Sequence, residues 1–325
     1  MKTIISKICI ALIFVFVLIS GILMSKKSIE FKSDFDPKLI GLDIDEYLKK
    51  SEEQITDIKE DVIKKVIWVN RPNQKTPISI VYLHGFTATS EELRPLPDMI
   101  AKDIKANLFF TRLTGHGRNS EAMELCSIKN WINDLHEAIE IGARIGEKII
   151  ILSSSTGGTI SVTSALDKKL SKNIMGYIFV SPNFGINHRL ASIITWPFSE
   201  YWLKLILGKT IKHYPRNDLN KKYWTMTYPT NALIPMAKLV NEVNDRDFSD
   251  IEKPALFYFS LEDKVVNPLK TKQFISGWGG KNTTKIIKLT GNDDKFSHVL
   301  AGSIISPNQT QHARKTMVNW IKNLN

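Results

Sequence analysis

Short apolar runs separated by polar turns recur along most of the chain. Most are rich in isoleucine, valine and phenylalanine, a composition typical of buried strands. They cover residues 78–83, 107–111, 149–152, 174–180, 254–259 and 285–289. Apolar residues at helical spacing mark three segments between or after these runs, at residues 91–102, 130–145 and 309–323. This alternation predicts an α/β fold with a mostly parallel central sheet and helices on both of its faces.

The pattern changes in the second half of the chain. Residues 182–246 lack strand alternation and are rich in tryptophan, tyrosine and leucine. We therefore interpret them as a helical cap inserted into a domain that covers residues 76–325. Inserted caps of this kind supply apolar walls for substrate cavities. An ordinary helical subdomain packed on itself is the alternative. Residues 28–75 are polar and would form an N-terminal extension.

The most apolar stretch of the chain lies near its N-terminus, at residues 8–24, with lysines on both sides. Its length is close to that of one membrane span, and no clear small-residue cleavage site accompanies it. We therefore predict that residues 1–27 are an uncleaved membrane anchor and that the folded domain lies outside the cytoplasm. The alternative is a signal peptide that is removed, which would give a secreted protein.

The overall charge is strongly positive, because 44 lysines and arginines against 33 acidic residues give a formal net charge of +11. The lysines are scattered, and no nucleic-acid-binding motif accompanies them. The charge therefore favours an anionic surface such as a membrane over nucleic acid as a partner. The two cysteines, Cys9 and Cys126, stand alone, and they indicate neither a disulfide framework nor a metal cluster.

The clearest chemical signature follows the apolar run at residues 149–152. Residues 153–158 read S-S-S-T-G-G, and a helical pattern begins at Thr159. A strand that turns sharply into a helix through small residues can hold one side chain in a strained, exposed position. This is the geometry of the nucleophile elbow, whose usual sequence is G-x-S-x-G. A plain strand-to-helix turn without chemistry is the alternative.

The glycines decide which of the three serines is the candidate nucleophile. Ser155 has Gly157 two positions later, where the turn leaves least room for a side chain. The same position relative to Ser153 or Ser154 holds a serine or a threonine. We therefore identify Ser155 as the candidate. Ser153 stands where the motif usually has its first glycine, which is a departure from the pattern.

A second motif follows the apolar run at residues 78–83 directly, and it reads His84-Gly85-Phe86. A Gly115-His116-Gly117 loop follows the next run. The H-G-F turn, the G-H-G loop and the serine elbow together resemble the α/β-hydrolase superfamily. Within it, the chain is most similar to the group of monoacylglycerol lipases, bacterial carboxylesterases and serine aminopeptidase-like proteins, from about residue 75 to the C-terminus.

The resemblance implies the partners of the candidate nucleophile. The triad acid would be Asp263, in the turn after the run 254–259, with neighbouring Glu262 as second choice. The general base would be His298, on the loop before the last helix. His312 is the alternative base, but it lies inside the expected terminal helix. The chain order Ser, Asp, His agrees with that of the superfamily.

The resemblance also implies an oxyanion hole. Its backbone N–H donors would be those of Phe86 and Thr156, with Thr87 as an alternative to Phe86. His116 would have a structural role in the G-H-G loop. No metal ion or organic cofactor is implied.

These expectations describe a serine hydrolase that cleaves carboxylic esters through an acyl-enzyme. The expected substrate is a small or lipid-like ester, such as a monoacylglycerol or lysolipid, reached at a membrane. An amidase, aminopeptidase or acyltransferase using the same triad is one alternative. A non-catalytic binding protein that keeps the fold is another. A haloalkane dehalogenase is disfavoured, because that reaction needs a carboxylate nucleophile at the elbow.

Overall fold

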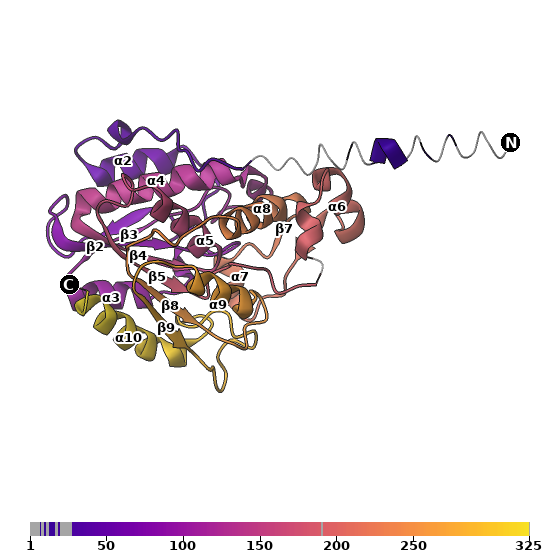
Figure 1. Cartoon of the computed structure of the whole chain (residues 1–325). Helices are drawn as coiled ribbons and strands as arrows, with labels where there is room; N and C mark the ends of the chain where they lie inside the picture. The colour runs from indigo at the N-terminus through magenta and orange to yellow at the C-terminus, as the bar shows by residue number, and fades with distance from the viewer. Residues whose placement is uncertain are drawn as a thin grey trace.

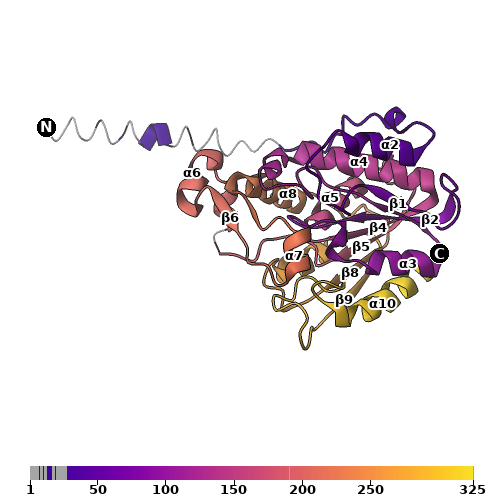
Figure 2. The same ribbon diagram turned by 180° about the vertical axis from the view of Figure 1, so that it is seen from behind.

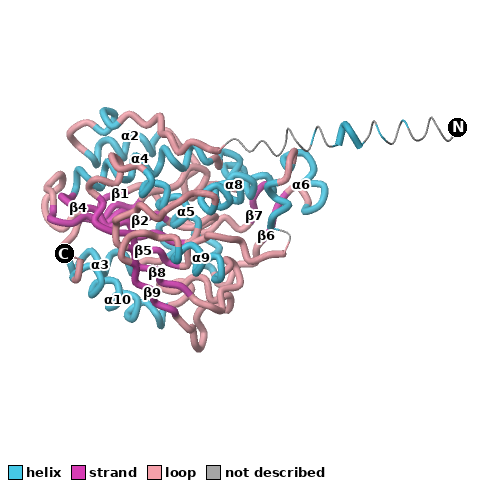
Figure 3. Tube along the Cα trace, viewed as in Figure 1, coloured by secondary structure: helices cyan, strands magenta, loops and turns pink. Residues whose placement is uncertain are grey.

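The computed structural model describes residues 28–189 and 191–324, together with residues 7, 10, 13–16 and 19. The strands of its main sheet are β1 (Lys65–Ile67), β2 (Thr76–Leu83), β3 (Asn107–Phe110), β4 (Gly146–Ser154), β5 (Ile174–Val180), β8 (Ala255–Phe259) and β9 (Asn282–Ile286). They lie in the order β1-β3-β2-β4-β5-β8-β9 (Figures 1 and 3). All neighbours pair in parallel except edge strand β1, which is antiparallel to β3. The predicted mostly parallel sheet is confirmed.

Helices cover both faces of this sheet (Figures 1 and 2). One face packs against α2 (Ile44–Glu53), α4 (Ile128–Ile145), α5 (Thr156–Val162), α8 (Leu233–Asn244) and α9 (Pro268–Ser276). The other face packs against α3 (Leu96–Ile104) and α10 (Thr310–Lys322). Alternate residues of the parallel strands point to the two faces, so each strand contributes to both cores. This two-sided burial is why the strands appear in the sequence as continuous apolar runs.

Two predicted elements are shifted or split. The last strand, predicted at residues 285–289, is β9 and begins three residues earlier, because the polar sequence Asn282-Thr283-Thr284 pairs with β8 at the exposed edge of the sheet. The helix predicted at residues 91–102 is a short 3-10 turn followed by α3. Pro95 and Pro97 lie at this break, and proline cannot donate the hydrogen bonds of a helix interior.

The segment predicted as a cap, residues 182–246, lies at one end of the sheet in both ribbon views (Figures 1 and 2). We call it the cap segment. It holds α6 (Ser199–Leu207), α7 (Asp218–Tyr223) and α8. It also holds an antiparallel ribbon of β6 (Thr210–Lys212) and β7 (Thr227–Pro229), which the sequence pattern did not predict. Strands of three residues are too short for alternation to reveal them. The exact domain boundaries stay predictions.

The N-terminal extension packs onto the domain through Ile40, Ile44 and Leu48, which are buried in the core beside α4. Glu52 anchors it further by a two-pronged ion pair with buried Arg112. The predicted anchor at residues 8–24 lies mostly outside the described residues. Among the residues that the structure does describe, no helix has the length and apolar character to cross a bilayer.

Candidate active site

Ser155 sits at the sharp turn between the end of β4 and the start of α5. Its φ of 50° and ψ of −120° are strained for a residue with a side chain, a conformation that costs of order 1–3 kcal/mol. Backbone hydrogen bonds hold it: Ser155 N donates to Val180 O at 2.9 Å, and Ser155 O accepts from Gly158 N at 2.9 Å and from Asn183 N at 3.0 Å. The strained turn therefore falls on Ser155 rather than on either neighbouring serine.

The small residues around the turn have clear steric reasons. A Cβ atom on Gly157 would come within 2.5 Å of the backbone oxygens of Leu83 and His84, at the end of β2. The elbow and the H-G-F turn therefore touch, and a side chain at Gly157 would separate them. Ser153 stands in place of a glycine, and its buried hydroxyl accepts a hydrogen bond from that of Ser161 at 3.0 Å.

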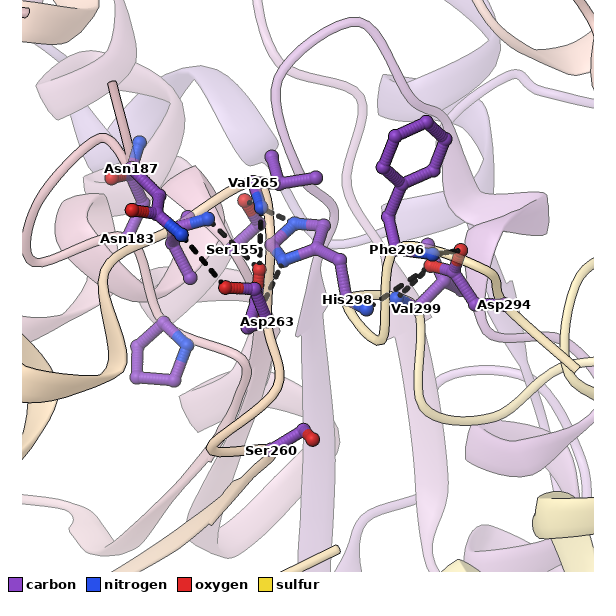
Figure 4. A network of polar contacts seen from close by, with 12 residues as sticks. Ser155, Asn183, Asn187, Ser260, Asp263, Val265, Asp294, Phe296, His298 and Val299 are labelled. Carbon is purple, nitrogen blue, oxygen red and sulfur yellow. Dashed lines mark hydrogen bonds and ion pairs between the residues drawn. The ribbon is translucent and has the colours of Figure 1, made fainter. Parts of the chain in front are cut away.

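Ser155, His298 and Asp263 form one hydrogen-bonded chain (Figure 4). Ser155 Oγ lies 3.0 Å from His298 Nε2, and His298 Nδ1 lies 2.8 Å from Asp263 Oδ2. A carboxylate only accepts hydrogen bonds, so Nδ1 carries the proton and Nε2 is free to accept from the serine hydroxyl. All three side chains are buried. The three candidates from distant parts of the sequence thus meet at one place.

Glu262 and His312, the alternatives for the acid and the base, do not take part in these hydrogen bonds. Asp263 is fixed by the N–H groups of Val265 and Val266, which donate to its Oδ1 at 2.8 and 2.9 Å. Neighbouring Glu262 is exposed and faces Lys288. His312 is exposed on α10, as expected for a residue inside the last helix.

A residue that the sequence analysis did not single out, Asp294, organises the loop that carries His298. Its carboxylate accepts the backbone N–H groups of Phe296, His298 and Val299 at 2.7, 3.1 and 2.8 Å (Figure 4). It also forms an ion pair with Arg216 of the cap segment. The sequence did show an acidic residue four positions before His298. Acidic residues in polar loops are usually solvated, however, so this spacing alone did not indicate a role.

The charges around His298 favour its protonated form. Burial is the largest single influence and lowers the pKa of His298, but the charge of Asp263 and its hydrogen bond raise it, with smaller contributions from Glu92 and Asp294. Together the acids outweigh burial, and the pKa lies above the usual 6.5. A base that gains stability on protonation suits proton transfer from the serine hydroxyl.

Two backbone N–H groups lie where an oxyanion hole is expected. No hydrogen bond within the described part of the chain uses the N–H of Phe86 or Thr156, and both residues line the cavity in front of Ser155. Gly85 allows the close approach, since a Cβ atom there would lie 3.1 Å from that of Ser155. Thr87, the alternative donor, has a positive φ of 65° and its carbonyl accepts the N–H of Thr225 from the cap segment.

The cavity has a volume of about 670 Å³ and lies between the sheet and the cap segment. Its apolar wall comes largely from the cap segment, through Trp224, Met226, Tyr228, Leu233 and Met236. Its charged residues are Glu92, Lys212, Arg216 and Lys264. Among the described residues, no group of three or more histidine, cysteine and acidic side chains is arranged to hold a metal ion.

The chain resembles known proteins in sequence and in fold. It is 27% identical to a thermostable monoacylglycerol lipase of Bacillus sp. (strain H-257) over 192 residues, which are 59% of this chain and 73% of the relative. A metagenome-derived lipolytic enzyme superposes with a TM-score of 0.65 at 14% identity, covering 82% of this chain and 100% of that one. A soluble variant of monoglyceride lipase from Saccharomyces cerevisiae gives 0.63 at 14% identity, with 81% and 92% covered.

The family model described as "Serine aminopeptidase, S33" matches residues 74–290, which is more than half of the chain. The matched region begins just before β2 and includes the H-G-F turn, the elbow at Ser155 and the acid Asp263. The lipolytic enzymes share the α/β-hydrolase fold of this chain. On the family match, the chain belongs to the serine aminopeptidase S33 family.

Proposed function

We propose that this protein is a serine hydrolase of the carboxylesterase or monoacylglycerol lipase kind, which cleaves carboxylic esters with an apolar acyl group. The observation that carries the proposal is the hydrogen-bonded chain from Asp263 through His298 to Ser155, which faces an apolar cavity. The lipase relative in sequence and the lipolytic neighbours in fold support ester chemistry.

In the proposed reaction, Ser155 Oγ attacks the ester carbonyl carbon while its proton moves to His298 Nε2. Asp263 keeps the required tautomer and stabilises the imidazolium. The carbonyl oxygen becomes an oxyanion that accepts the N–H groups of Phe86 and Thr156, and one such donor is typically worth about 3 kcal/mol of the barrier. The carbon–oxygen bond to the alcohol then breaks, and the alcohol leaves with the proton from His298. Water attacks the acyl-enzyme by the same route and releases the acid.

The charge of the cavity favours esters over substrates with a free amino terminus. Arg216 is paired with Asp294, but Lys212 and Lys264 add positive charge to the lining, and a protonated amine would be repelled there. Glu92, the acid in the lining, is buried and already accepts a backbone N–H. A neutral or anionic ester fits this distribution better than the cationic substrate of an aminopeptidase.

Fluorophosphonate labelling of the wild type and of Ser155→Ala, Ser154→Ala and Ser153→Ala tests the proposal. A phosphonylating probe reacts with a serine that has an activated hydroxyl. We expect labelling to be lost in Ser155→Ala and retained in Ser154→Ala. Ser153→Ala, which removes the hydrogen bond to Ser161, should label more slowly but still label.

A panel of p-nitrophenyl esters, monoacylglycerols and matched amides, with and without an added alcohol acceptor, then separates the rival reactions. Ester hydrolysis that depends on Ser155 supports the proposal. Faster turnover of the amides, or acyl transfer that exceeds hydrolysis, would replace it with one of the rival hydrolase or transferase activities. A folded wild type that neither labels nor turns over any substrate would favour a binding protein.

A further inference from the structure

Glu92 is a buried carboxylate beside the candidate active site that the reaction described above does not use. It ends the 3-10 turn Ser90–Glu92, has 3% of its surface exposed and lines the substrate cavity. A buried carboxylate is unfavourable unless hydrogen bonds or opposite charge compensate for lost water. The groups that compensate for the burial of Glu92 therefore indicate its role.

The first of these groups is the oxyanion turn. The backbone N–H of Gly85 donates to Glu92 Oε2 at 2.8 Å. A Cβ atom on Gly85 would meet Glu92 Oε1 at 2.9 Å and Ser155 Cβ at 3.1 Å, so Gly85 is packed against both side chains. The next N–H along the chain is that of Phe86, the proposed oxyanion donor. Glu92 thus fixes the residue from which this donor projects.

The second group is His298. The negative charge of Glu92 raises the pKa of His298, alongside the larger effect of Asp263 and a further contribution from Asp294, while burial opposes all three. In return, the charge of His298 lowers the pKa of Glu92, as does the N–H of Gly85, although burial dominates and the net pKa is raised above 4.5. The ionised carboxylate and the protonated imidazole therefore stabilise each other.

The remaining polar groups that face Glu92 are neutral. The hydroxyl of Tyr82 donates to Glu92 Oε2 at 3.3 Å, and that of Ser154 also stabilises the ionised carboxylate. Neither hydroxyl can neutralise the carboxylate by an opposite charge. Glu92 and His298 both line the cavity, and protonated His298 is therefore the cationic group whose charge Glu92 stabilises during turnover.

We propose, on the basis of the serine hydrolase function above, that Glu92 is a positioning residue that holds the oxyanion turn through Gly85 and supplies a second negative charge to protonated His298. Both effects act in the transition state, when the oxyanion and the imidazolium exist together. Neither contributes to ground-state binding of a neutral ester. Loss of Glu92 should therefore lower kcat more than it raises KM.

Glu92→Gln isolates the charge, because it keeps the shape of the side chain and an oxygen that can accept the Gly85 N–H. The readout is the pH dependence of kcat/KM on a p-nitrophenyl ester, together with the pH dependence of fluorophosphonate labelling. We expect the acid limb of both profiles to move to lower pH by on the order of half a unit. At the plateau, kcat should fall about threefold, the factor that corresponds to half a pKa unit.

Glu92→Ala removes the charge and the acceptor of the Gly85 N–H together. Its kcat should fall by roughly 10- to 100-fold, which is below the full loss of an oxyanion donor because the Phe86 N–H remains. Glu91→Gln is the matched control, since this neighbouring acid pairs with Arg94 instead of facing the cavity. It should keep the wild-type profile.

An acid limb in Glu92→Gln that coincides with the wild type overturns the proposal, whatever Glu92→Ala does and even if that variant fails to fold. This failure is distinct from failure of the proposed function. In the first case the wild type still labels and hydrolyses esters through Ser155. In the second case the wild type itself does neither.

Discussion

Arg216 of the cap segment forms an ion pair with Asp294 on the loop that carries His298. The carboxylate of Asp294 is fully buried, whereas the Arg216 side chain is 31% exposed. The guanidinium also lies over the ring of Phe296, 4.9 Å from its centre. Since Asp294 accepts the N–H of His298, the cap segment and the candidate general base are joined by a short chain of contacts.

Arg216→Met should therefore disturb the histidine loop. It leaves Asp294 buried without its cationic partner, and we expect a stability loss of about 1–3 kcal/mol, below the usual cost of breaking a fully buried pair because Arg216 is partly exposed. We expect kcat to fall roughly tenfold, because small displacements of a catalytic group are costly. Thermal unfolding and steady-state ester hydrolysis measure the two effects.

Arg314→Met is the control for this variant. Arg314 makes a two-pronged ion pair with Asp103, and its side chain is 34% exposed, but it lies on α10 outside the cavity lining. Its loss should lower stability without lowering kcat. If both variants lowered kcat equally, the coupling between the cap segment and the His298 loop would be refuted.

Asp263→Asn should reduce kcat by about 10⁴-fold with little change in fold, because an amide can favour the wrong tautomer of the histidine. The two N–H groups that now donate to Asp263 Oδ1 can still donate to an amide oxygen. Burst-phase and steady-state kinetics on an activated ester measure the loss.

Glu262→Gln is the comparison for the acid, because it removes a neighbouring exposed charge. Its kcat should stay within a factor of about two, as is usual for an exposed charge that makes no close contact with the site. A larger loss in Glu262→Gln than in Asp263→Asn would mean that the wrong carboxylate has been assigned to the triad.

The elbow could be predicted from sequence because its requirements are local. A strand, a nucleophile and a small residue two positions later lie within one short stretch, and the strain at Ser155 follows from that sequence. Asp263 and His298 were identified as triad residues through the family resemblance, and only the fold shows that they contact each other. Most strand runs were likewise visible because burial on both faces leaves few polar positions in them.

Other parts of the site depend on contacts that no local pattern records. Arg216 and Asp294 are 78 residues apart in sequence. Glu92 is the second of two adjacent glutamates, and only the fold places it under Gly85 while Glu91 faces Arg94. The ribbon β6–β7 and the start of β9 were missed for a related reason, since short or exposed strands carry little apolar signal.

Gly157→Ala should abolish most of the activity. The new methyl group would lie 2.5 Å from two backbone oxygens at the end of β2, so the elbow and the oxyanion turn must move apart. Backbone cannot yield as a flexible side chain can, and we expect at least a 100-fold loss of kcat. Fluorophosphonate labelling rates and ester kinetics report the loss.

Gly277→Ala provides the steric comparison, because a Cβ atom there would lie at an ordinary contact distance of 3.6 Å from Phe274 O. This variant should keep wild-type kinetics. Wild-type labelling by Gly157→Ala would instead show that the elbow and the H-G-F turn are not in the close contact described above.

His116 should make the protein less stable in acid. Burial is the main cause that lowers its pKa, to about 4, and Nε2 has no hydrogen-bond partner among the described residues. The folded pKa lies below the unfolded value of about 6.5, so the unfolded chain binds the proton more readily. Stability is therefore complete above pH 6.5 and falls as the pH drops toward 4.

Urea unfolding at pH 7.5 and pH 4.5 measures this effect. Between these values His116 alone should account for about 2 kcal/mol of lost stability, and His116→Gln should lose less on acidification by that amount. The pKa of buried His84 is lowered mainly by burial and, to a smaller extent, by the charge of His116. The burial part adds to the loss in both proteins and cancels in the comparison. His312→Gln replaces an exposed histidine and should leave the wild-type difference intact. If the wild type and His116→Gln lost equal stability on acidification, burial would not lower the pKa of His116 in the folded protein.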